Sequence, residues 1–497
     1  MMHAPILPLL LPLLMGSLLL LGHRLELPLK RLLSLAATWS LVPLSAWLVW
    51  LAGDDQLRVY ALGDWQPPFG IILLVDRLSA MLLLLTALLA GFALLYACRG
   101  DDERGPNFHA LFQFQLLGIN GAFLTGDLFN LFVFFEILLI SSYALLLHGN
   151  GAERVRAGMH YVVLNLLGSA LFLLGVGSLY GLLGTLNMAD LAARVAVADA
   201  SQTPLLAAAG YLLLTVFALK AAILPLYFWL PRAYASASAP VAALFAIMTK
   251  VGLYAILRVF GLIYGAQAGE LAGLANGLLW WLALLTIAAG VVGALSARNL
   301  QRLLAYLVVL SVGVLLAGLA MDSQTALAAA LYYLLHSTLI GGAMFLLADL
   351  VSRQRGAEAG DLTQGPSLRQ PLLLGGLFFL GSISLAGLPP FSGFLGKLML
   401  LRAADPGEAL WLWPAVLVAG LGMLLALSRA GSALFWRPGG DVIEGEDDRV
   451  RLFATVGLLL GGPALVIFAA PVMAYVEATA RQLRDLAPYL NLIGGGA

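Results

Sequence analysis

Long apolar stretches recur along the whole chain, and they limit its possible folds more than any other feature. The hydrocarbon core of a bilayer is about 30 Å thick, so a run of about 20 apolar residues predicts one spanning helix. Fourteen such runs occur, with approximate cores at 4–22, 33–52, 71–97, 107–125, 128–147, 158–183, 205–228, 239–264, 271–295, 302–320, 325–349, 371–401, 409–435 and 452–477. The sequence therefore predicts an all-α polytopic membrane protein with about 14 transmembrane helices.

The composition excludes several other classes of protein. Hydrophobic residues make up 61% of the 497 residues and charged residues only 11%, whereas soluble domains carry about 25% charged residues. A soluble enzyme is therefore excluded, and lipid is the expected surroundings. The one cysteine, Cys98, cannot by itself form a disulfide, an iron–sulfur cluster or a Cys-rich zinc site. With 27 basic and 27 acidic residues the chain has no net charge, so no nucleic-acid partner is expected. No metal or cofactor is expected either.

The basic residues predict the orientation in the membrane. Loops after odd-numbered helices hold 17 Lys and Arg, while loops after even-numbered helices and both termini together hold 5. Basic loops stay on the cytoplasmic side. We therefore expect both termini on the outer side of the membrane.

Three connections are long enough to have a structure of their own. Residues 53–70 carry turn signals around a short β-like run, which predicts an outer hairpin. Residues 187–199 predict a surface helix that Asn187 caps. The acidic inner segment Asp441 to Asp448 is expected to be solvated, with docking of another subunit as the alternative.

Two helices, the seventh and the twelfth, contain breaking residues. The seventh carries Pro225 and Pro231, and the twelfth carries Pro389 and Pro390. Proline removes an amide donor and clashes with the preceding turn, so both helices are expected to open. Because they are five helices apart, repeats of helices 4–8 and 9–13 would be inverted relative to each other, as in many transporters. We divide the chain into three N-terminal helices with the hairpin (1–106), two five-helix repeats (107–265 and 266–436), and a last helix with its tail (437–497).

The lysines are distributed unlike the arginines. Only Lys30 of the four lysines lies in a loop, while Lys220, Lys250 and Lys397 lie inside apolar helices. Arginine cannot be deprotonated in practice, whereas a lysine amine can lose its proton when it is buried. A lysine at depth can therefore accept and release a proton. A charged lysine at the bilayer centre costs about 2.5–3.5 kcal/mol, which implies a function.

Glu136 is the acid most central to a spanning segment. An ionised carboxylate close to Lys220 would favour the protonated amine, so the two residues are predicted to form an adjustable pair. The alternative is a static ion pair that holds the fifth and seventh helices together.

Lys250, His336 and Lys397 extend this row of residues. Lys250 has no acid near it in sequence and lies about ten residues into its helix, too deep to reach an interface. Histidine titrates near neutral pH, so His336 suits an intermediate carrier, with a role in packing as the alternative. Arg77 and Arg258 are expected to be structural.

No zinc-peptidase motif, phosphate-binding loop or dinucleotide glycine signature occurs in the sequence. Without a nucleotide site, an ion gradient or a partner protein must supply the energy. The sequence therefore indicates a transporter or a coupling subunit, not an enzyme.

Several motifs together resemble the D subunit of the multisubunit Mrp-type sodium/proton antiporters. They are the segments at 63–70 and 75–80, Phe134-Phe135-Glu136, Lys220 to Leu226 with Trp229-Leu230-Pro231, Met248 to Gly252, and Leu388 to Lys397. The resemblance covers essentially the whole chain. Its Glu, Lys and Pro motifs are shared with the antiporter-like subunits of respiratory complex I. The segment at 63–70 points more specifically to the D subunit of the antiporters.

This resemblance implies a fourteen-helix subunit of a heteromeric assembly in the bacterial inner membrane. It implies a proton path along Glu136, Lys220, Lys250, His336 and Lys397, with other subunits, protons and sodium as partners. Complex I relatives often have a lysine one turn after the histidine. Here that position is Ile340, so water would have to connect His336 with Lys397.

Three other functions remain open at this point. A proton-pumping subunit of a redox-driven complex shares all the buried charges and differs in its partners. A lone transporter of an organic solute would be active as a single chain. A purely structural scaffold would tolerate loss of all three buried lysines.

Overall fold

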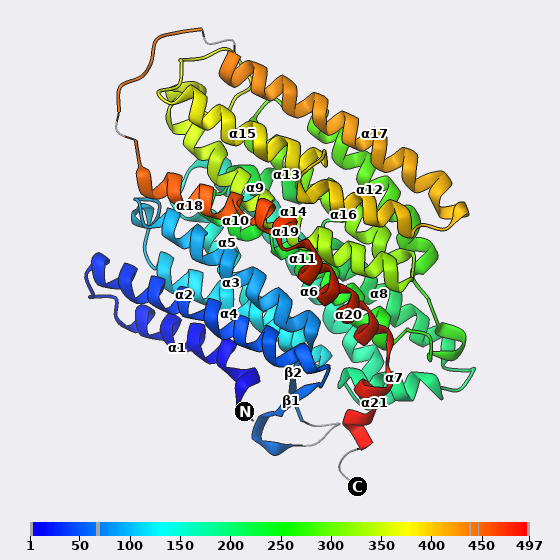
Figure 1. The fold of residues 1–497 in the computed structure, drawn as a ribbon. Helices are drawn as coiled ribbons and strands as arrows, with labels where there is room; N and C mark the ends of the chain where they lie inside the picture. The colour runs from blue at the N-terminus through cyan, green and yellow to red at the C-terminus, as the bar shows by residue number, and fades with distance from the viewer. Residues whose placement is uncertain (1–2, 66–69, 437–438, 446, 495–497) are drawn as a thin grey trace.

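A computed structural model describes residues 3–65, 70–436, 439–445 and 447–494. These residues form a bundle of helices with one small two-stranded sheet (Figure 1). In the first half of the chain the helices are α1 (Leu7–Leu21), α2 (Leu27–Leu51), α3 (Arg77–Ala97), α4 (Phe108–Leu124), α5 (Leu128–Leu147), α6 (Ala152–Leu183), α7 (Met188–Ala196), α8 (Thr203–Ala221), α9 (Trp229–Ser236), α10 (Ala239–Phe245) and α11 (Met248–Leu262). In the second half they are α12 (Asn276–Ser296), α13 (Leu300–Ala320), α14 (Gln324–Arg353), α15 (Pro371–Ala386), α16 (Ser392–Ala403), α17 (Pro406–Gly431), α18 (Arg449–Leu459), α19 (Gly461–Ile467), α20 (Ala469–Arg484) and α21 (Ala487–Gly494).

The predicted all-α membrane fold is confirmed. In the described part of the chain, twelve helical segments are long and apolar enough to cross a membrane. Two further helices at predicted positions are shorter, α4 with 17 residues and α15 with 16. The count of fourteen spanning helices therefore stays a prediction.

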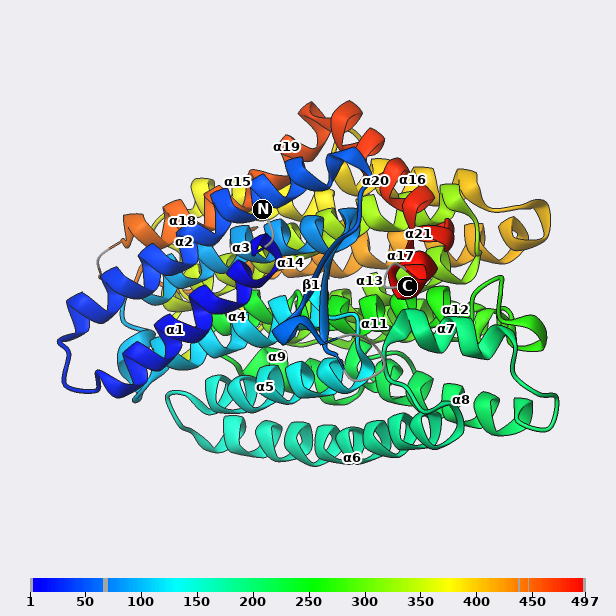
Figure 2. The same cartoon turned by 90° about the horizontal axis from the view of Figure 1, so that it is seen from below.

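The helices are arranged around α14. Figure 1 shows α1 and α2 at one edge of the bundle, α12 and α17 at the opposite edge, and α14 between them. Figure 2 shows α6 and α8 along one face. Most residues are buried in α13 (89%), in α14 (83%) and in the segment of α10 and α11 (94%), whereas only 39% are buried in the spans of α6, α12 and α17. Side chains on these central helices are therefore the most deeply buried in the bundle.

Short polar side chains fix where many helices begin. Asp76 and Ser79 form a reciprocal cap at the start of α3. A single side chain accepts from the first backbone amides of α5, α7, α13, α14 and α18, namely Asp127, Asn187, Asn299, Ser323 and Asp448. Each cap satisfies amides that the helix itself cannot pair. The predicted surface helix is α7, and Asn187 caps it as expected.

The hairpin differs in its bounds from the prediction. Strand β1 (Arg58–Ala61) pairs antiparallel with β2 (Ile72–Val75), so that Arg58 lies opposite Val75. The sequence placed 72–75 at the start of a helix, because an apolar run does not by itself distinguish a buried strand from a helix. The helix begins only at Arg77, after the cap. Positions 66–69 of the motif at 63–70 lie outside the described residues.

The acidic segment near residue 441 is bound to the protein in part. Asp447 accepts hydrogen bonds from Arg369 and Gln370, and Asp448 caps α18. Residue 446 lies outside the described part. The expectation of a merely solvated loop is therefore wrong for Asp447 and Asp448.

Both predicted helix breaks are present. Helix α8 ends at Ala221, and Ala222 adopts a left-handed conformation before α9 begins at Trp229. Helix α15 ends at Ala386, and Gly387 is left-handed before α16 begins. The helix expected over 239–264 is nearly continuous: Ala246 and Ile247 interrupt the regular hydrogen bonding between α10 and α11 but keep right-handed helical dihedral angles.

Glycines bring two pairs of helices into close contact. On α4, Gly118 and Gly121 face Leu138 and Phe134 of α5. On α12, Gly290 and Gly293 face Leu310 and Tyr306 of α13 in the same way. Small residues let membrane helices approach closely where no hydrophobic driving force acts between them.

We predict that Gly290→Ala destabilises the protein. The added methyl carbon would lie 2.6 Å from the backbone nitrogen of Leu310, so α12 and α13 must separate. Overpacking of this kind costs about 1–3 kcal/mol, and the midpoint of thermal unfolding in detergent should fall. Gly277→Ala on the same helix is the control, because its methyl meets nothing within 4 Å. Equal midpoints for the two variants would contradict the prediction.

Candidate functional site

Glu136 lies in the middle of α5 and faces α6. Its side chain is half-buried, and the Ser169 hydroxyl of α6 donates a hydrogen bond to Oε1. Ser169 also donates to the backbone oxygen of Asn165, one turn earlier. A side chain on α6 thus holds the carboxylate.

Lys220 lies in the last turn of α8 and is buried. Its Nζ donates to Oδ1 of Asn165 at 3.3 Å, and it lies 5.8 Å from the centre of the Phe135 ring. Within the described residues, no ion pair within 4.0 Å joins Lys220 to Glu136. The static ion pair considered as the alternative is therefore not formed. The two charged groups are instead connected through one turn of α6.

Asn165 and Ser169 are not among the residues predicted from the sequence. Both are polar, both are buried, and they are four residues apart inside an otherwise apolar run. Residues four apart share a helix face, so this pattern was readable in principle. What the sequence could not tell is that this face turns toward α5 and α8.

Lys250 is the third residue of α11 and is completely buried. Among the described residues, its Nζ has no hydrogen-bond partner, and neither has the neighbouring Thr249 hydroxyl. Ala246 and Ile247, the two residues before α11, keep right-handed helical dihedral angles, so α10 and α11 form one nearly continuous helix and Lys250 gains no favourable helix end. Gly252 packs against the backbone of Ala221, so the start of α11 lies against the end of α8 beside Lys220.

His336 and Lys397 extend the row on the other side. His336 lies fully buried in α14, with Nδ1 2.8 Å from the Ser392 hydroxyl at the start of α16. In the described part of the chain its Nε2 has no partner. Lys397 on α16 donates to the carbonyl oxygens of Leu385 (3.1 Å) and Ala386 (2.9 Å), which end α15. A helix C-terminus favours a cation, in contrast to the surroundings of Lys250.

The five predicted residues thus come from neighbouring elements. Contacts join α5, α6, α8 and α11 on one side, and α10, α14 and α16 on the other. Figure 1 shows α10, α11 and α14 near the middle of the bundle, and Figure 2 shows α5, α6 and α8 toward one face. A buried row of ionisable groups without fixed counter-charges is suited to moving protons, because each member can change its charge.

Comparison with known proteins identifies the family. Residues 125–422 match the family described as "NADH:quinone oxidoreductase/Mrp antiporter, TM". The chain belongs to this family. The D subunit of a probable K(+)/H(+) antiporter of Rhizobium meliloti is 42% identical over 98% of this chain and 96% of its own length. The D subunit of a Na(+)/H(+) antiporter of Bacillus subtilis is 40% identical over 87% of this chain and 86% of its own length.

Solved structures agree with this assignment. A chain of the Mrp complex from Dietzia sp. has a TM-score of 0.88 and 26% identity, and the match covers 99% of both chains. A chain of an archaeal membrane-bound sulfane sulfur reductase has a TM-score of 0.89 and 26% identity, over 99% of this chain and 100% of that chain. The resemblance to the Mrp antiporter family that the motifs indicated is confirmed.

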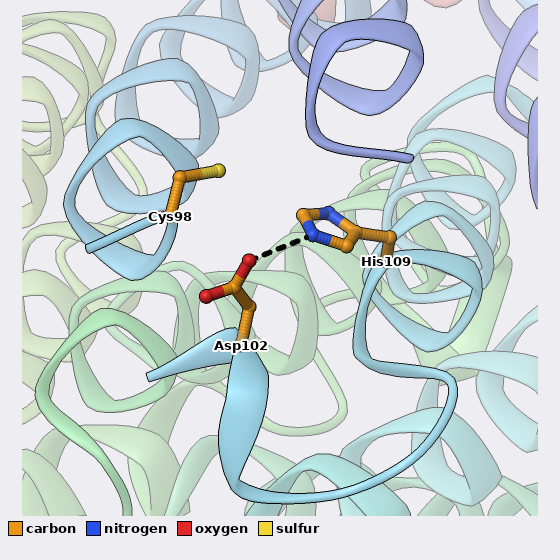
Figure 3. A group of neighbouring side chains, drawn as sticks. All are labelled: Cys98, Asp102 and His109. Atoms are coloured by element: carbon orange, nitrogen blue, oxygen red, sulfur yellow. Dashed lines mark hydrogen bonds and ion pairs between the residues drawn. The ribbon is translucent and has the colours of Figure 1, made fainter. Parts of the chain in front are cut away.

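A second cluster of ionisable groups in this family member joins Cys98, Asp102 and His109 (Figure 3). Their ligand atoms lie within 4.8 Å of one another, as in a metal site. However, Arg31 of α2 already donates to both Asp102 oxygens, at 2.7 and 2.8 Å, and His109 Nε2 lies 3.0 Å from Oδ2. A divalent cation would have to displace the guanidinium. The chemistry of the cluster favours an ion-pair network over a metal centre.

The acid–base properties of this cluster support that interpretation. Burial acts to raise the pKa of the Asp102 carboxyl, but the hydrogen bonds from Arg31 and His109 outweigh it and hold the pKa well below its usual range. Burial, with the charge of Asp102, raises the pKa of the Cys98 thiol to about 12. Metals bind the thiolate form, which this site disfavours.

We predict that Cys98 is unreactive in the folded protein. Because its pKa is about 12 and the residue is buried, almost no accessible thiolate exists at pH 8. Mass spectrometry after treatment with N-ethylmaleimide should find the native protein unmodified and the denatured protein modified once. Modification of the native protein at the rate of a free thiol would refute the prediction.

Proposed function

We propose that this protein is the proton-translocating subunit of a multisubunit Na⁺/H⁺ antiporter in the bacterial plasma membrane. Its proton relay consists of Glu136, Lys220, Lys250, His336 and Lys397. The observation that carries the proposal is Lys250, a completely buried amine without a partner among the described residues. A permanently charged amine in that position would be strongly destabilising, so the group has to exist at least partly in its neutral form.

Two helix ends support the relay. Lys220 and Lys397 lie near the C-terminal ends of α8 and α15, which favour a bound proton. Lys250 has neither such an end nor a hydrogen-bond partner among the described residues. In the proposed mechanism the proton therefore rests on Lys220 and Lys397 and passes through Lys250 only briefly. Asn165 holds the amine of Lys220 whether it donates as an ammonium or as a neutral amine.

The surface beside Glu136 supports a heteromeric assembly. Glu136 is half-buried, and its helix neighbours Val133 and Ile140 are 36% and 63% exposed. A charged carboxylate on a lipid-facing surface is costly. A neighbouring protein subunit on this face of α5 would remove the carboxylate from lipid.

A second candidate function is proton pumping in a redox-driven complex. The similarity in fold to the archaeal sulfane sulfur reductase supports it. The antiporter is favoured because the relatives named as antiporter subunits are 40–42% identical, against 26% for that structure. Mass spectrometry of the native assembly would distinguish the two: small membrane subunits support the antiporter, and iron–sulfur subunits support the pump.

The two five-helix units, 107–265 and 266–436, are proposed to be inverted repeats. The paired breaks after Ala221 and Ala386 support this, as does the glycine packing. Two glycines three residues apart face the next helix in both units, from α4 to α5 and from α12 to α13. Phe134 and Tyr306 occupy equivalent contact positions. The N-terminal unit 1–106 and the C-terminal unit 437–497 would flank these repeats.

We predict that Lys220→Ala abolishes ion exchange and leaves the assembly intact. Removing a proton carrier should lower sodium-driven proton movement about a hundredfold or more in inverted vesicles from an antiporter-deficient host. Lys30→Ala is the matched control, since it removes a lysine outside the buried row. Running the assay with Na⁺ and with K⁺ identifies the cation, and native gels report the assembly. Full exchange by the Lys220→Ala assembly would refute the relay.

We predict that both termini lie on the outer side. Loops after odd-numbered helices hold 17 basic residues, whereas the other loops and both termini hold 5. This distribution supports a cytoplasmic position for the loops after odd-numbered helices and an outer position for the termini. Alkaline phosphatase fused after residue 497 should be active, and a fusion in the loop between α5 and α6 at residue 150 should be inactive. The reverse pattern would overturn the orientation but not the relay.

A further inference from the structure

A large cavity opens beside the C-terminal end of α11. It has a volume of about 480 Å³ and lies between α11, α12, the turn from α13 to α14, and the C-terminal helices α20 and α21. Its polar lining includes Arg258, Asn276, Asp322, Ser323, Arg484 and Tyr489. Arg484 and Asp322 form an ion pair of 2.7 Å at the exposed rim. The cavity has room and polar partners for several water molecules.

A second cavity continues toward the middle of the protein. Its volume is about 10 Å³, close to the space for one water molecule. Apolar side chains line it, together with Tyr254. Leu257 of α11 and Leu319 of α13 line both cavities and therefore separate them.

Three helices carry the lining of the two cavities inward. On α13 the lining passes from Leu319 to Leu315, and on α14 it passes from Leu327 through Leu331 to Leu334. On α11 it passes from Gly261 to Leu257 and Leu253, and Lys250 follows about 4.5 Å further along the axis, near the same face. His336 lies on the opposite face of α14, because two residues turn a helix by about 200°, and it faces α16. Both cavities thus lead toward Lys250.

We propose that this pair of cavities is the outer proton access route to Lys250, closed here by Leu257 and Leu319. The inference rests on the proposed function and adds the path by which protons exchange with the outer side. Narrow apolar constrictions close a pore by excluding water, and modest widening lets a water chain form. A proton can travel along such a transient chain.

The same geometry excludes a sodium ion. The charges at the cavity are balanced: Arg484 pairs with Asp322, and Arg258 pairs with Asp76 at 2.7 Å. Tyr489 donates to Asp76, and Arg258 Nε donates to the Tyr254 hydroxyl, so the guanidinium is held next to the constriction. Beyond these paired charges, a hydrated cation would meet an apolar space of about 10 Å³, which is too small for an ion with its bound water.

Cysteine labelling tests the route directly. In a Cys98→Ser background, vesicles of each orientation holding the full assembly are treated with a membrane-impermeant, sulfonate-bearing methanethiosulfonate. Gly261→Cys, where a side chain meets no atom within 4 Å, should react from the side of the termini only. Leu334→Cys should react at least about tenfold more slowly, and addition of Leu257→Ala should restore fast labelling. Leu285→Cys, half-exposed on the outer surface of α12, is the lipid-facing control and should not react.

A leak measurement tests the function of the constriction. Leu257→Ala should collapse an imposed pH gradient at least about tenfold faster than the wild type without added Na⁺ or K⁺, while Leu257→Ile should not. Adding Lys250→Ala to Leu257→Ala should remove the leak, because the route ends at that amine.

Three outcomes would each overturn the route. They are an unreactive Gly261→Cys, equal labelling of Gly261→Cys and Leu334→Cys without the alanine change, and a leak that survives Lys250→Ala. The labelling does not depend on exchange activity, so the route can fail while the relay through Lys220 stands.

Discussion

The polar groups within reach differ among the three buried amines. A membrane helix normally satisfies its own backbone, so carbonyls and amides become available only where it is interrupted. The break at the end of α15 supplies such groups, because the carbonyls of Leu385 and Ala386 accept from Lys397. Lys220 instead donates to the Asn165 side chain, and Lys250 has no partner among the described residues. Chemically identical side chains therefore have unequal surroundings, and that inequality orders the row.

Close packing keeps these interruptions in place. Gly252 fits against the backbone at the end of α8, and Gly393 fits beside the ring of His336. A side chain at either position would push the broken ends apart, because the neighbouring atoms are backbone or a buried ring. The burial of the helices differs accordingly. Helices α6, α12 and α17 lie at the surface of the bundle, whereas most residues of α11, α13 and α14 are buried.

The fold class and both helix breaks could be predicted from the sequence, because hydropathy and proline act locally, and the motifs indicated the family. The irregular turn between α10 and α11 could not, because no proline or glycine marks the chain at Ala246 and Ile247. The residues of β2 were placed in a helix, because four apolar residues carry no period of their own. Glu136 and Lys220 were predicted as a pair, but Asn165 and Ser169, which link the two side chains through α6, were not predicted. Such partners depend on how helices rotate against each other, which a single sequence does not encode locally.

In the proposed mechanism, a closed access route limits leakage. If a water chain always connected Lys250 with one side, protons could cross without exchange and dissipate the gradient. Leu257 and Leu319 close the cavity toward Lys250 and would act as the barrier to this leak. Under this proposal, a change elsewhere in the assembly that wets the constriction would open the route, so the hydration of this narrow segment would link proton access to the other subunits.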